Sequence, residues 1–418
     1  FSSKGSNNWA VTGNYTRSGM LMLANDPHLK LTAPNIWYLN HMKSESLDVI
    51  GASLVGVPGV IIGRNKHISW GITNSYSDAQ DIYALDMKSN NTYVSGGKVH
   101  QLVERVEEIK VKGKSQPVRL VVKESIYGPI INDLYDIKDS VPLSLYWTAL
   151  HFSDATVDSY HMLNYATSFE EFKDALRHYV APSMNFVYSD HDGNIAYHLA
   201  GKIPQRKRGH SGRYVVPGNG TYDHNLSDEI PFEDMPSVLN PERGYIASAN
   251  NRVAPPGYKW TLTQDYFRSW RALRIEELLH SFMNKNQTIT WKHMRDMQMD
   301  VKSYVFEDFR NVFVNMSFPE DNDMDSWRKR LVKWDGVAKI DTQEPALFEG
   351  WFQRVSMLAY KETGMPWKDP YFLQHAFTTE DPACFKYHNM TCIQYGAQVL
   401  IETVTHFRQK YGRVPFWG

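Results

Sequence analysis

A serine preceded by glycine lies near the start of the sequence, within FSSKGSNNWAV. A serine hydroxyl is a weak nucleophile unless a base lies beside it, and Ser6 is surrounded by neither a G-x-S-x-G elbow nor an S-x-x-K pattern. Cleavage between Gly5 and Ser6 would supply a base, because it frees the α-amine of the serine itself. The reference pKa of an α-amine is about 7.7–8.0, so a useful fraction is unprotonated at neutral to mildly alkaline pH. On spacing alone, an ordinary loop serine remains the competing interpretation.

The composition narrows the class of protein. The 418 residues are 42% hydrophobic and 22% charged, as in ordinary globular proteins. The net charge of -1 gives no argument for binding nucleic acid or an anionic membrane surface. No apolar run approaches the roughly 20 residues that span a bilayer. We therefore expect a globular protein with no nucleic-acid partner and no membrane span.

Cysteines and glycosylation sequons indicate a compartment. The two cysteines, Cys384 and Cys392, lie close to His388, but a zinc site would need a fourth ligand, so we expect a local disulfide, with free thiols as the alternative. Seven Asn-x-Ser/Thr sequons occur where about three would arise by chance. This excess predicts a secreted or lumenal glycoprotein in an extracellular, periplasmic or lysosomal setting. The sequon asparagines are Asn14, Asn90, Asn219, Asn225, Asn286, Asn315 and Asn389.

The periodicity of apolar residues changes along the chain. Up to about residue 270, short β-rich runs broken by Gly, Pro and Asn predict strands, and Asp192-Gly193 predicts a hairpin. One helix is predicted over 168–180, where Ser168 and Glu171 are spaced as a capping box. Later segments show spacing near 3.6 residues and predict helices over 271–282, 290–301, 323–336, 346–364 and 392–412. We expect one α+β unit with a helical region packed on it.

Several separated segments resemble one known family. The segments, in order, are GSNNWAV, ANDPHLKLTAPNIWY, GVPGVIIGRNKHISWGITN, NFVYSDHDGNIAYHLAGKIPQR, NPERGYIASANNRV and YFRSWRALRIEELL. Their order and approximate spacing resemble the β chain of the penicillin acylase (penicillin amidase) family of N-terminal nucleophile hydrolases. The resemblance implies a four-layer αββα fold. Residues 1–5 would be a remnant of a spacer or α segment, 6–280 the nucleophile-bearing core, and 281–418 a mainly helical part of the same β chain, truncated at its C-terminus.

The resemblance also implies roles for individual residues. Ser6 would be the nucleophile, with its own amine as base. His28 corresponds to the family position that packs near the nucleophile and orients it, although a purely structural histidine remains an alternative. No cofactor is implied for catalysis.

The same resemblance implies an oxyanion hole. The side-chain amide of Asn250 and the backbone N–H of Asn74 would stabilise the oxyanion, since fixed donors at the developing charge lower the barrier. Arg271 matches the family arginine near the catalytic asparagine, but Arg274 lies close enough for a small alignment error to exchange them. A simple Asn-Asn turn and a helix-face arginine are the structural alternatives.

Two further sets of residues have corresponding family positions. Leu29 and Ile62 would line an apolar acyl pocket, unless both are plain core residues. The loop SYSDAQD carries Asp78 and Asp81, which correspond to a structural calcium site in some relatives. A solvated turn is the alternative there.

Together these features predict an amidohydrolase that cleaves itself between Gly5 and Ser6. It would hydrolyse small linear amides through an acyl-Ser6 ester, in partnership with an α chain from the same precursor. With the Gly5–Ser6 bond intact, the amine is an amide and the chain would be an uncleaved precursor. A catalytically silent family member, kept as a glycoprotein with a binding or structural role, is the alternative. A third hypothesis is an acylase-fold enzyme for peptide or lipid amides.

Overall fold

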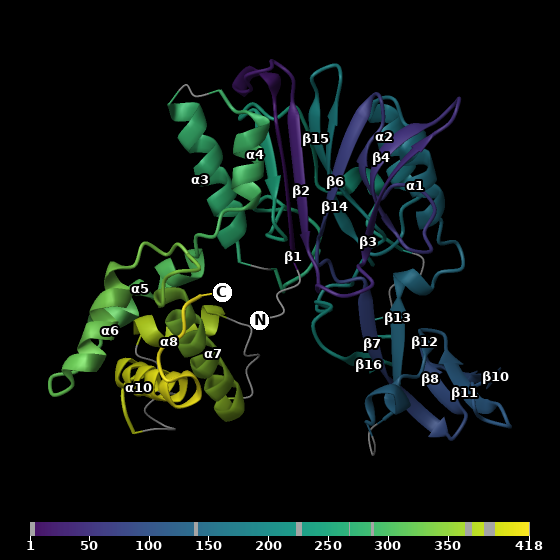
Figure 1. Cartoon of the computed structure of the whole chain (residues 1–418). Coiled ribbons are helices and arrows are strands. Elements are labelled where there is room, and N and C mark those ends of the chain that lie inside the picture. The colour runs from purple at the N-terminus through teal and green to yellow at the C-terminus, as the bar shows by residue number, and fades with distance from the viewer. Residues whose placement is uncertain are drawn as a thin grey trace. The chain divides into compact units, whose positions relative to one another are not determined.

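The computed structural model describes residues 5–137, 141–222, 228–266, 268–285, 288–363, 370–379 and 389–417 (Figure 1). The chain divides into two compact units, residues 1–298 and 299–418. The sequence predicts that the nucleophile-bearing core ends at residue 280. Met294 and Met297 lie beyond that boundary and belong to a hydrophobic cluster of the first unit. Within the described residues, no helix is long and apolar enough to cross a membrane.

Two antiparallel sheets build the centre of the first unit. The larger sheet has seven strands in the order β17-β15-β14-β6-β5-β4-β3, and the smaller has three in the order β18-β1-β2. The strands of the larger sheet are β3 (Trp37–Lys43), β4 (Asp48–Leu54), β5 (Ile62–Arg64), β6 (Ile68–Asn74), β14 (Met184–Asp190), β15 (Ile195–Ala200) and β17 (Ser237–Leu239). Those of the smaller sheet are β1 (Gly5–Val11), β2 (Met22–His28) and β18 (Tyr245–Ser248).

Strand alternation sorts the side chains of β1 into two layers. Ala10 packs with Val187 and Leu199 between the two sheets. Trp9 faces the other way, where its Nε1 donates to the sulfur of Met294 at 3.3 Å. Helices α3 (Trp270–Asn284) and α4 (Trp291–Gln298) cover this outer face. The small sheet therefore has sheet on one side and helices on the other.

Helices α1 (Thr156–Tyr165) and α2 (Phe169–Arg177) cover the outer face of the seven-stranded sheet. Their aromatic residues meet those of the sheet, as where Phe172 and Tyr188 lie 4.8 Å apart between ring centroids. The layers run helix, sheet, sheet, helix (Figure 1). This confirms the expected αββα fold.

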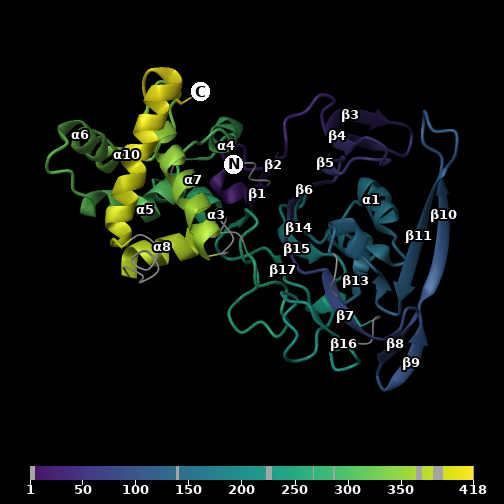
Figure 2. The same cartoon turned by 90° about the horizontal axis from the view of Figure 1, so that it is seen from below.

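The first unit carries two further sheets beyond this sandwich. One joins β7 (Gln80–Ser89), β8 (Thr92–Ser95), β9 (Lys98–Gln101) and β13 (Leu143–Trp147), with β16 (Val216–Gly218) paired to β7. The other joins β10 (Val103–Ile109), β11 (Val118–Ser125) and β12 (Gly128–Pro129). Figure 2 shows β10 and β11 side by side as a long hairpin. Buried tyrosines form the core beside the first of these sheets. The ring of Tyr83 stacks on that of Tyr127, with 4.1 Å between the ring centroids.

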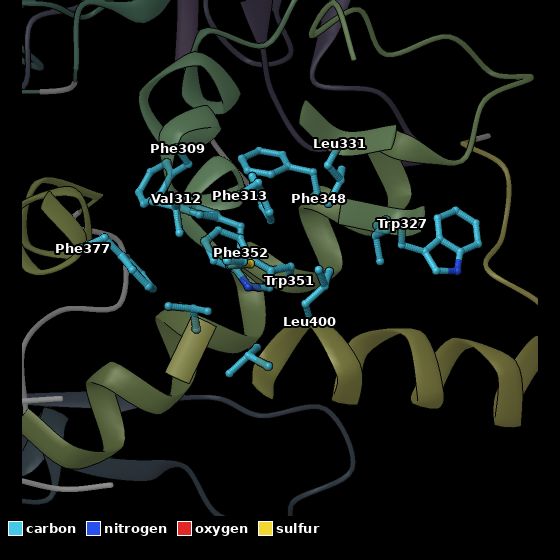
Figure 3. Packing of buried hydrophobic residues seen from close by; sticks show 14 of the residues in the cluster. Phe309, Val312, Phe313, Trp327, Leu331, Phe348, Trp351, Phe352, Phe377 and Leu400 are labelled. Atoms are coloured by element: carbon cyan, nitrogen blue, oxygen red, sulfur yellow. The ribbon is translucent and has the colours of Figure 1, made fainter. Parts of the chain in front are cut away.

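The second unit is helical and has an aromatic core. Its helices are α5 (Tyr304–Asn315), α6 (Asn322–Lys333), α7 (Glu344–Thr363), α8 (Pro370–Thr379) and α10 (Cys392–Tyr411). Figure 3 shows Phe309, Phe313, Phe348 and Trp351 gathered between the helices. Helix α10 begins at a capping box formed by Thr391 with Gln394, and it ends at Gly412 in the left-handed conformation.

The structure contains the hairpin and the helix that the sequence predicts within the first unit. The predicted hairpin forms, with Gly193 at a φ of 93° between β14 and β15. Helix α2 begins where expected, and Ser168 accepts a hydrogen bond from the Glu171 N–H. The predicted capping box is incomplete, because the Glu171 carboxylate accepts from the N–H of Thr167 at 2.8 Å. The acidic side chain therefore bonds the donor one residue earlier.

A buried histidine in β15 makes the stability of the first unit depend on pH. His198 is 1% exposed, and neither ring nitrogen has a hydrogen-bond partner among the described residues. Burial, together with the positive charge of Lys173, lowers the pKa of His198 to about 3. Its ring centroid lies 4.4 Å from that of Phe232, so the neutral imidazole packs as an apolar group.

We expect acidification to destabilise this unit through His198. The unfolded chain binds a proton near pH 6.5 and the folded chain only near pH 3, so stability falls as pH drops between these values. The free energy of unfolding should fall by about 2–3 kcal/mol between pH 6.5 and 4.5 from this residue. Urea titrations at both pH values measure it. His198→Leu should reduce the loss, whereas the exposed His161→Leu should leave it intact; equal losses in both variants would contradict the assignment.

Candidate active site

Strand β1 places Ser6 at the start of the small sheet. Ser6 pairs with Pro27 and Gly5 with His28 across β1 and β2. Alternation puts the Ser6 side chain on the same face as Ala10, toward the seven-stranded sheet. Ser6 is 9% exposed. The loop-serine interpretation does not hold, because Ser6 belongs to a strand.

Asn250 meets the backbone of Ser6 from a distant part of the chain. The N–H of Ser6 donates to Asn250 Oδ1 at 2.7 Å, across 244 positions of sequence. Asn250 is fully buried and has a left-handed φ of 64°, which asparagine tolerates better than most residues. The Asn-Asn pair also forms a turn, since Asn251 Oδ1 accepts from the Ala249 N–H at 2.9 Å. The turn and the contact with Ser6 therefore occur together.

Asn74 joins the same group from the end of β6. Its carbonyl accepts a hydrogen bond from Asn250 Nδ2 at 2.7 Å. Its side-chain oxygen accepts from the Tyr76 N–H at 2.7 Å, which turns the chain after the strand. The structure thus brings Ser6, Asn74 and Asn250 together; their roles in stabilising an oxyanion remain predictions.

Arg271, in the first turn of α3, converges on the same atoms. Its Nη1 donates to the Ser6 carbonyl at 2.7 Å and to Asn7 Oδ1 at 2.6 Å. Its Nη2 donates to Asn250 Oδ1 at 2.8 Å. Burial lowers the pKa of Arg271, and the negative charge of Asp26 opposes that effect. Arg274 instead pairs with Glu277 at 2.7 Å, so Arg271 is the arginine that contacts Ser6.

Gly5 is closely packed against two side chains of the candidate site. A Cβ at this position would lie 2.8 Å from Arg271 Nη2 and 3.2 Å from Asn250 Oδ1. A contact under about 3 Å forces one of the two groups to move. The residue before Ser6 therefore leaves the space in which Arg271 and Asn250 meet.

His28 lies beside this group, but its side chain is on the opposite face of β2 from that of Pro27, which pairs with Ser6. Its Nε2 is 3.2 Å from Asp26 Oδ2 and 3.4 Å from Asn7 Nδ2, and the side chain is 37% exposed. An orienting role therefore remains a prediction. Asp26 and Asn7 were not singled out from the sequence, although the spacing in NDPH puts Asp26 and His28 on one face of a strand.

Asn25 is a third residue that the sequence motifs did not reveal. Its Nδ2 donates to the Asn7 carbonyl at 2.6 Å and to the Ile72 carbonyl at 3.0 Å. Its Oδ1 accepts from the Ile72 N–H at 3.0 Å. A single amide thus joins β1 to β6, the strand that ends at Asn74.

The predicted pocket residues are partly buried. Leu29 follows β2, and Ile62 begins β5. Ile62 packs at the margin of the cluster beneath α1 and α2, which agrees with the core interpretation. Their contact with an acyl group remains a prediction.

The predicted calcium loop is held by an arginine. Arg206 Nε donates to both carboxylate oxygens of Asp81, at 2.9 and 3.1 Å, and Nη2 donates to the Asp78 carbonyl at 2.6 Å. Thr263 Oγ1 donates to the Asp78 carboxylate at 3.2 Å. The described residues contain no group of three or more His, Cys, Asp or Glu side chains able to hold a metal. Asp81 is thus neutralised by a guanidinium, whereas Asp78 Oδ2 is buried with no hydrogen-bond partner among the described residues, and calcium at this loop remains a prediction.

The modification sites divide into described and undescribed positions. Cys392 is buried at the start of α10 and is disulfide-bonded, whereas Cys384 lies outside the described residues. Asn225 and Asn286 also lie outside them. The other five sequon asparagines, Asn14, Asn90, Asn219, Asn315 and Asn389, are all exposed.

Comparisons with known proteins give a consistent family. The family model described as Penicillin amidase matches residues 1–418. The chain is 29% identical over 395 residues to Acyl-homoserine lactone acylase QuiP of Pseudomonas aeruginosa, covering 87% of this chain and 46% of the relative. It is 26% identical over 416 residues to Penicillin G acylase of Escherichia coli, covering 96% of this chain and 47% of the relative. The chain thus spans about half the length of these relatives.

A solved structure has the same fold. The thermostable penicillin G acylase of Alcaligenes faecalis matches with a TM-score of 0.75 at 20% sequence identity. The match covers 97% of this chain and 79% of that chain.

We expect the Asp78–Asp81 loop to depend on Arg206 and not on calcium. EDTA should leave the melting temperature of the protein unchanged. Arg206→Gln would remove the guanidinium from the buried Asp81 carboxylate and should cost about 3–5 kcal/mol of stability. Arg213→Gln, which alters the exposed pair with Asp265, is the matched control and should cost less than about 1 kcal/mol. Melting in EDTA at a lower temperature, reversed by added calcium, would instead support the calcium prediction.

Proposed function

Because the chain belongs to the penicillin amidase family, we propose that it is the nucleophile-bearing chain of an amidohydrolase. It would hydrolyse linear amides of small molecules through an acyl-serine intermediate at Ser6, together with an α chain from the same precursor. The names of the relatives, acyl-homoserine lactone acylase and penicillin G acylase, support an acyl amide as the substrate class. The third hypothesis, peptide or lipid amides, is tested by a panel of acyl anilides of different chain lengths.

The observation that carries this proposal is the convergence on the Ser6 backbone. Asn250 Oδ1 holds the Ser6 nitrogen and Arg271 holds its carbonyl, from a strand end and a helix far along the sequence. An ordinary strand residue needs neither contact. A nucleophile whose own nitrogen acts as base needs both, because the nitrogen must stay in place after the chain is cut.

The proposed chemistry begins with cleavage between Gly5 and Ser6. The freed amine takes the hydroxyl proton as the oxygen attacks the substrate carbonyl, and it then protonates the leaving amine. The nearby guanidinium of Arg271 disfavours an ammonium group and so lowers the pKa of the amine. Water then hydrolyses the acyl-Ser6 ester and regenerates the serine.

An oxyanion forms in both halves of this reaction. We propose Asn250 Nδ2 and the Asn74 N–H as its donors, each worth roughly 3–4 kcal/mol of barrier. Asn250 Nδ2 donates to the Asn74 carbonyl in the chain described here. The substrate oxygen would have to replace that acceptor.

We also propose a secreted or lumenal location. The exposure of all five described sequon asparagines supports it, since glycans require accessible positions. The disulfide at Cys392 supports it as well.

We expect Ser6→Ala to abolish both processing and turnover. Protein expressed from the complete coding sequence should show a new N-terminus at Ser6, and intact mass should show that the variant stays uncut. Turnover of a chromogenic acyl anilide should fall to background in the variant. A wild-type protein that is neither cut nor active would favour the silent glycoprotein instead. Cleavage of the Ser6→Ala chain between residues 5 and 6 would contradict the nucleophile assignment.

We expect Gly5→Ala to slow processing without altering the mature enzyme. The added methyl group displaces Arg271 or Asn250, and loss of about one hydrogen bond should slow cleavage about tenfold or more. A time course of intact mass measures the rate. Mature enzyme from this variant begins at the same Ser6, so its kcat per active site should equal the wild-type value. Processing at the wild-type rate would show that this contact is not needed.

A further inference from the structure

We propose that Asp26 is a positioning residue for Ser6, acting through Asn7 and Arg271 and setting the charge around the nucleophile. The inference rests on the function proposed above. It gives a role to a carboxylate that neither the motif reasoning nor the comparisons assign.

A continuous path of hydrogen bonds joins Asp26 to Ser6. Asp26 Oδ2 accepts from Asn7 Nδ2 at 3.2 Å, and Asn7 Oδ1 accepts from Arg271 Nη1 at 2.6 Å. The same Nη1 donates to the Ser6 carbonyl at 2.7 Å. Arg271 Nη2 shares Asn250 Oδ1 with the Ser6 N–H. A change at Asp26 therefore reaches both backbone groups of Ser6 through two side chains.

The path also links two opposite charges, those of Asp26 and Arg271. Within the described residues, Arg271 donates to one backbone carbonyl oxygen and to two side-chain amide oxygens, all of them uncharged. The partly buried guanidinium is therefore balanced from a distance, and Asp26 is the carboxylate that attracts it. Asp26 Oδ1 is buried and has no hydrogen-bond partner among the described residues, so part of this carboxylate is shielded from water.

The other elements around Ser6 add little charge. Among the described residues, the other titratable groups in contact or in electrostatic interaction with Asn7 and Arg271 are His28 on β2 and Tyr76 after β6. Burial raises the pKa of Tyr76, which keeps its hydroxyl neutral. The nearby side chains of β6, β18 and β14 that bond one another are uncharged: Thr73, Ser248 and Asn185. On α3, Arg274 is paired with Glu277.

The sign of the effect follows from these positions. In the cut chain the Ser6 amine would lie beside Asn250 Oδ1, close to the guanidinium that shares this acceptor. Arg271 disfavours the ammonium form, whereas Asp26 favours it. Removal of the Asp26 charge therefore lowers the pKa of the amine and moves the acid limb of kcat/KM to lower pH.

The test compares pH profiles of processed enzyme made from the complete coding sequence. In Asp26→Asn we expect the acid limb of kcat/KM to move down by about 0.5–1 pH unit. Asp26→Glu keeps the charge and should retain the wild-type limb. Asp48→Asn is the matched control, because Asp48 pairs with His41 at 2.7 Å on β3 and β4, and its limb should not move. The Asp26→Asn shift should persist in a His28→Gln background, which removes the imidazole as its source.

The outcomes separate this inference from the proposed function. Active wild-type enzyme with an unmoved limb in Asp26→Asn overturns the role of Asp26 and leaves the function standing. Wild-type protein that is uncut and inactive overturns the function itself. Should Asp26→Asn fail to fold or to be cut, Asp26→Glu decides: a shifted limb there overturns the assignment to charge, and a wild-type limb supports it.

Discussion

One amide oxygen holds the candidate site together. Asn250 Oδ1 accepts from the N–H of Ser6 and from Arg271 Nη2, so it fixes the start of β1 relative to the start of α3. It does so only because residue 250 follows β18, whose pairing with β1 reaches Asn8 opposite Ser248. The left-handed turn that comes directly after this strand then directs the side chain at Ser6. The register of β18 on β1, the left-handed turn after β18 and the position of α3 together bring these atoms within hydrogen-bond distance.

The distance between the two sheets is fixed by a second amide. Asn25 bonds the backbone of both Asn7 and Ile72, and Gly71 lacks a side chain where a Cβ would lie 3.0 Å from the Asn25 Cβ. Buried polar side chains impose geometry because unpaired donors and acceptors are costly in the interior. An apolar residue at position 25 would still fill the interface, but it would not fix β1 against β6. Ser6 and Asn74 belong to these two strands.

Much of this arrangement could be predicted from the sequence, and the exceptions have physical reasons. The αββα fold followed from a resemblance carried by several segments in order. Helix α1 was missed because two of its buried residues, Ser159 and Asn164, are polar, so it shows no clean apolar stripe. Asn164 is buried because both ends of its amide bond the backbone of Val60. Helix α5 was missed because its many aromatic and β-branched residues have weak helix propensity, which the aromatic core overrides.

The site residues show the same division. The sequence could predict Ser6, Asn74, Asn250 and Arg271 because each lies in a segment that resembles the family. The structure brings these four residues together. Asp26, Asn7 and Asn25 could not be found by motif, since a hydrogen-bond path depends on register between strands and not on spacing within one. Arg206 stands in the short basic run QRKRGH at 205–210, a run typical of an exposed loop, yet its side chain lies buried against Asp81. One sequence gives no sign of which charge in such a run turns inward.

The pairing of β1 has a consequence for the conformational entropy of the cut chain. Chain ends ordinarily fray, and a catalytic group on a loose end must be ordered anew in every turnover. Strand β1, which would begin at Ser6 after cleavage, is the central one of its sheet, flanked by β2 and β18. Removal of Gly5 takes away one of the seven positions paired with β2 and none of those paired with β18. The new terminus would thus be ordered from the moment it forms, because folding of the uncut chain has already fixed its backbone.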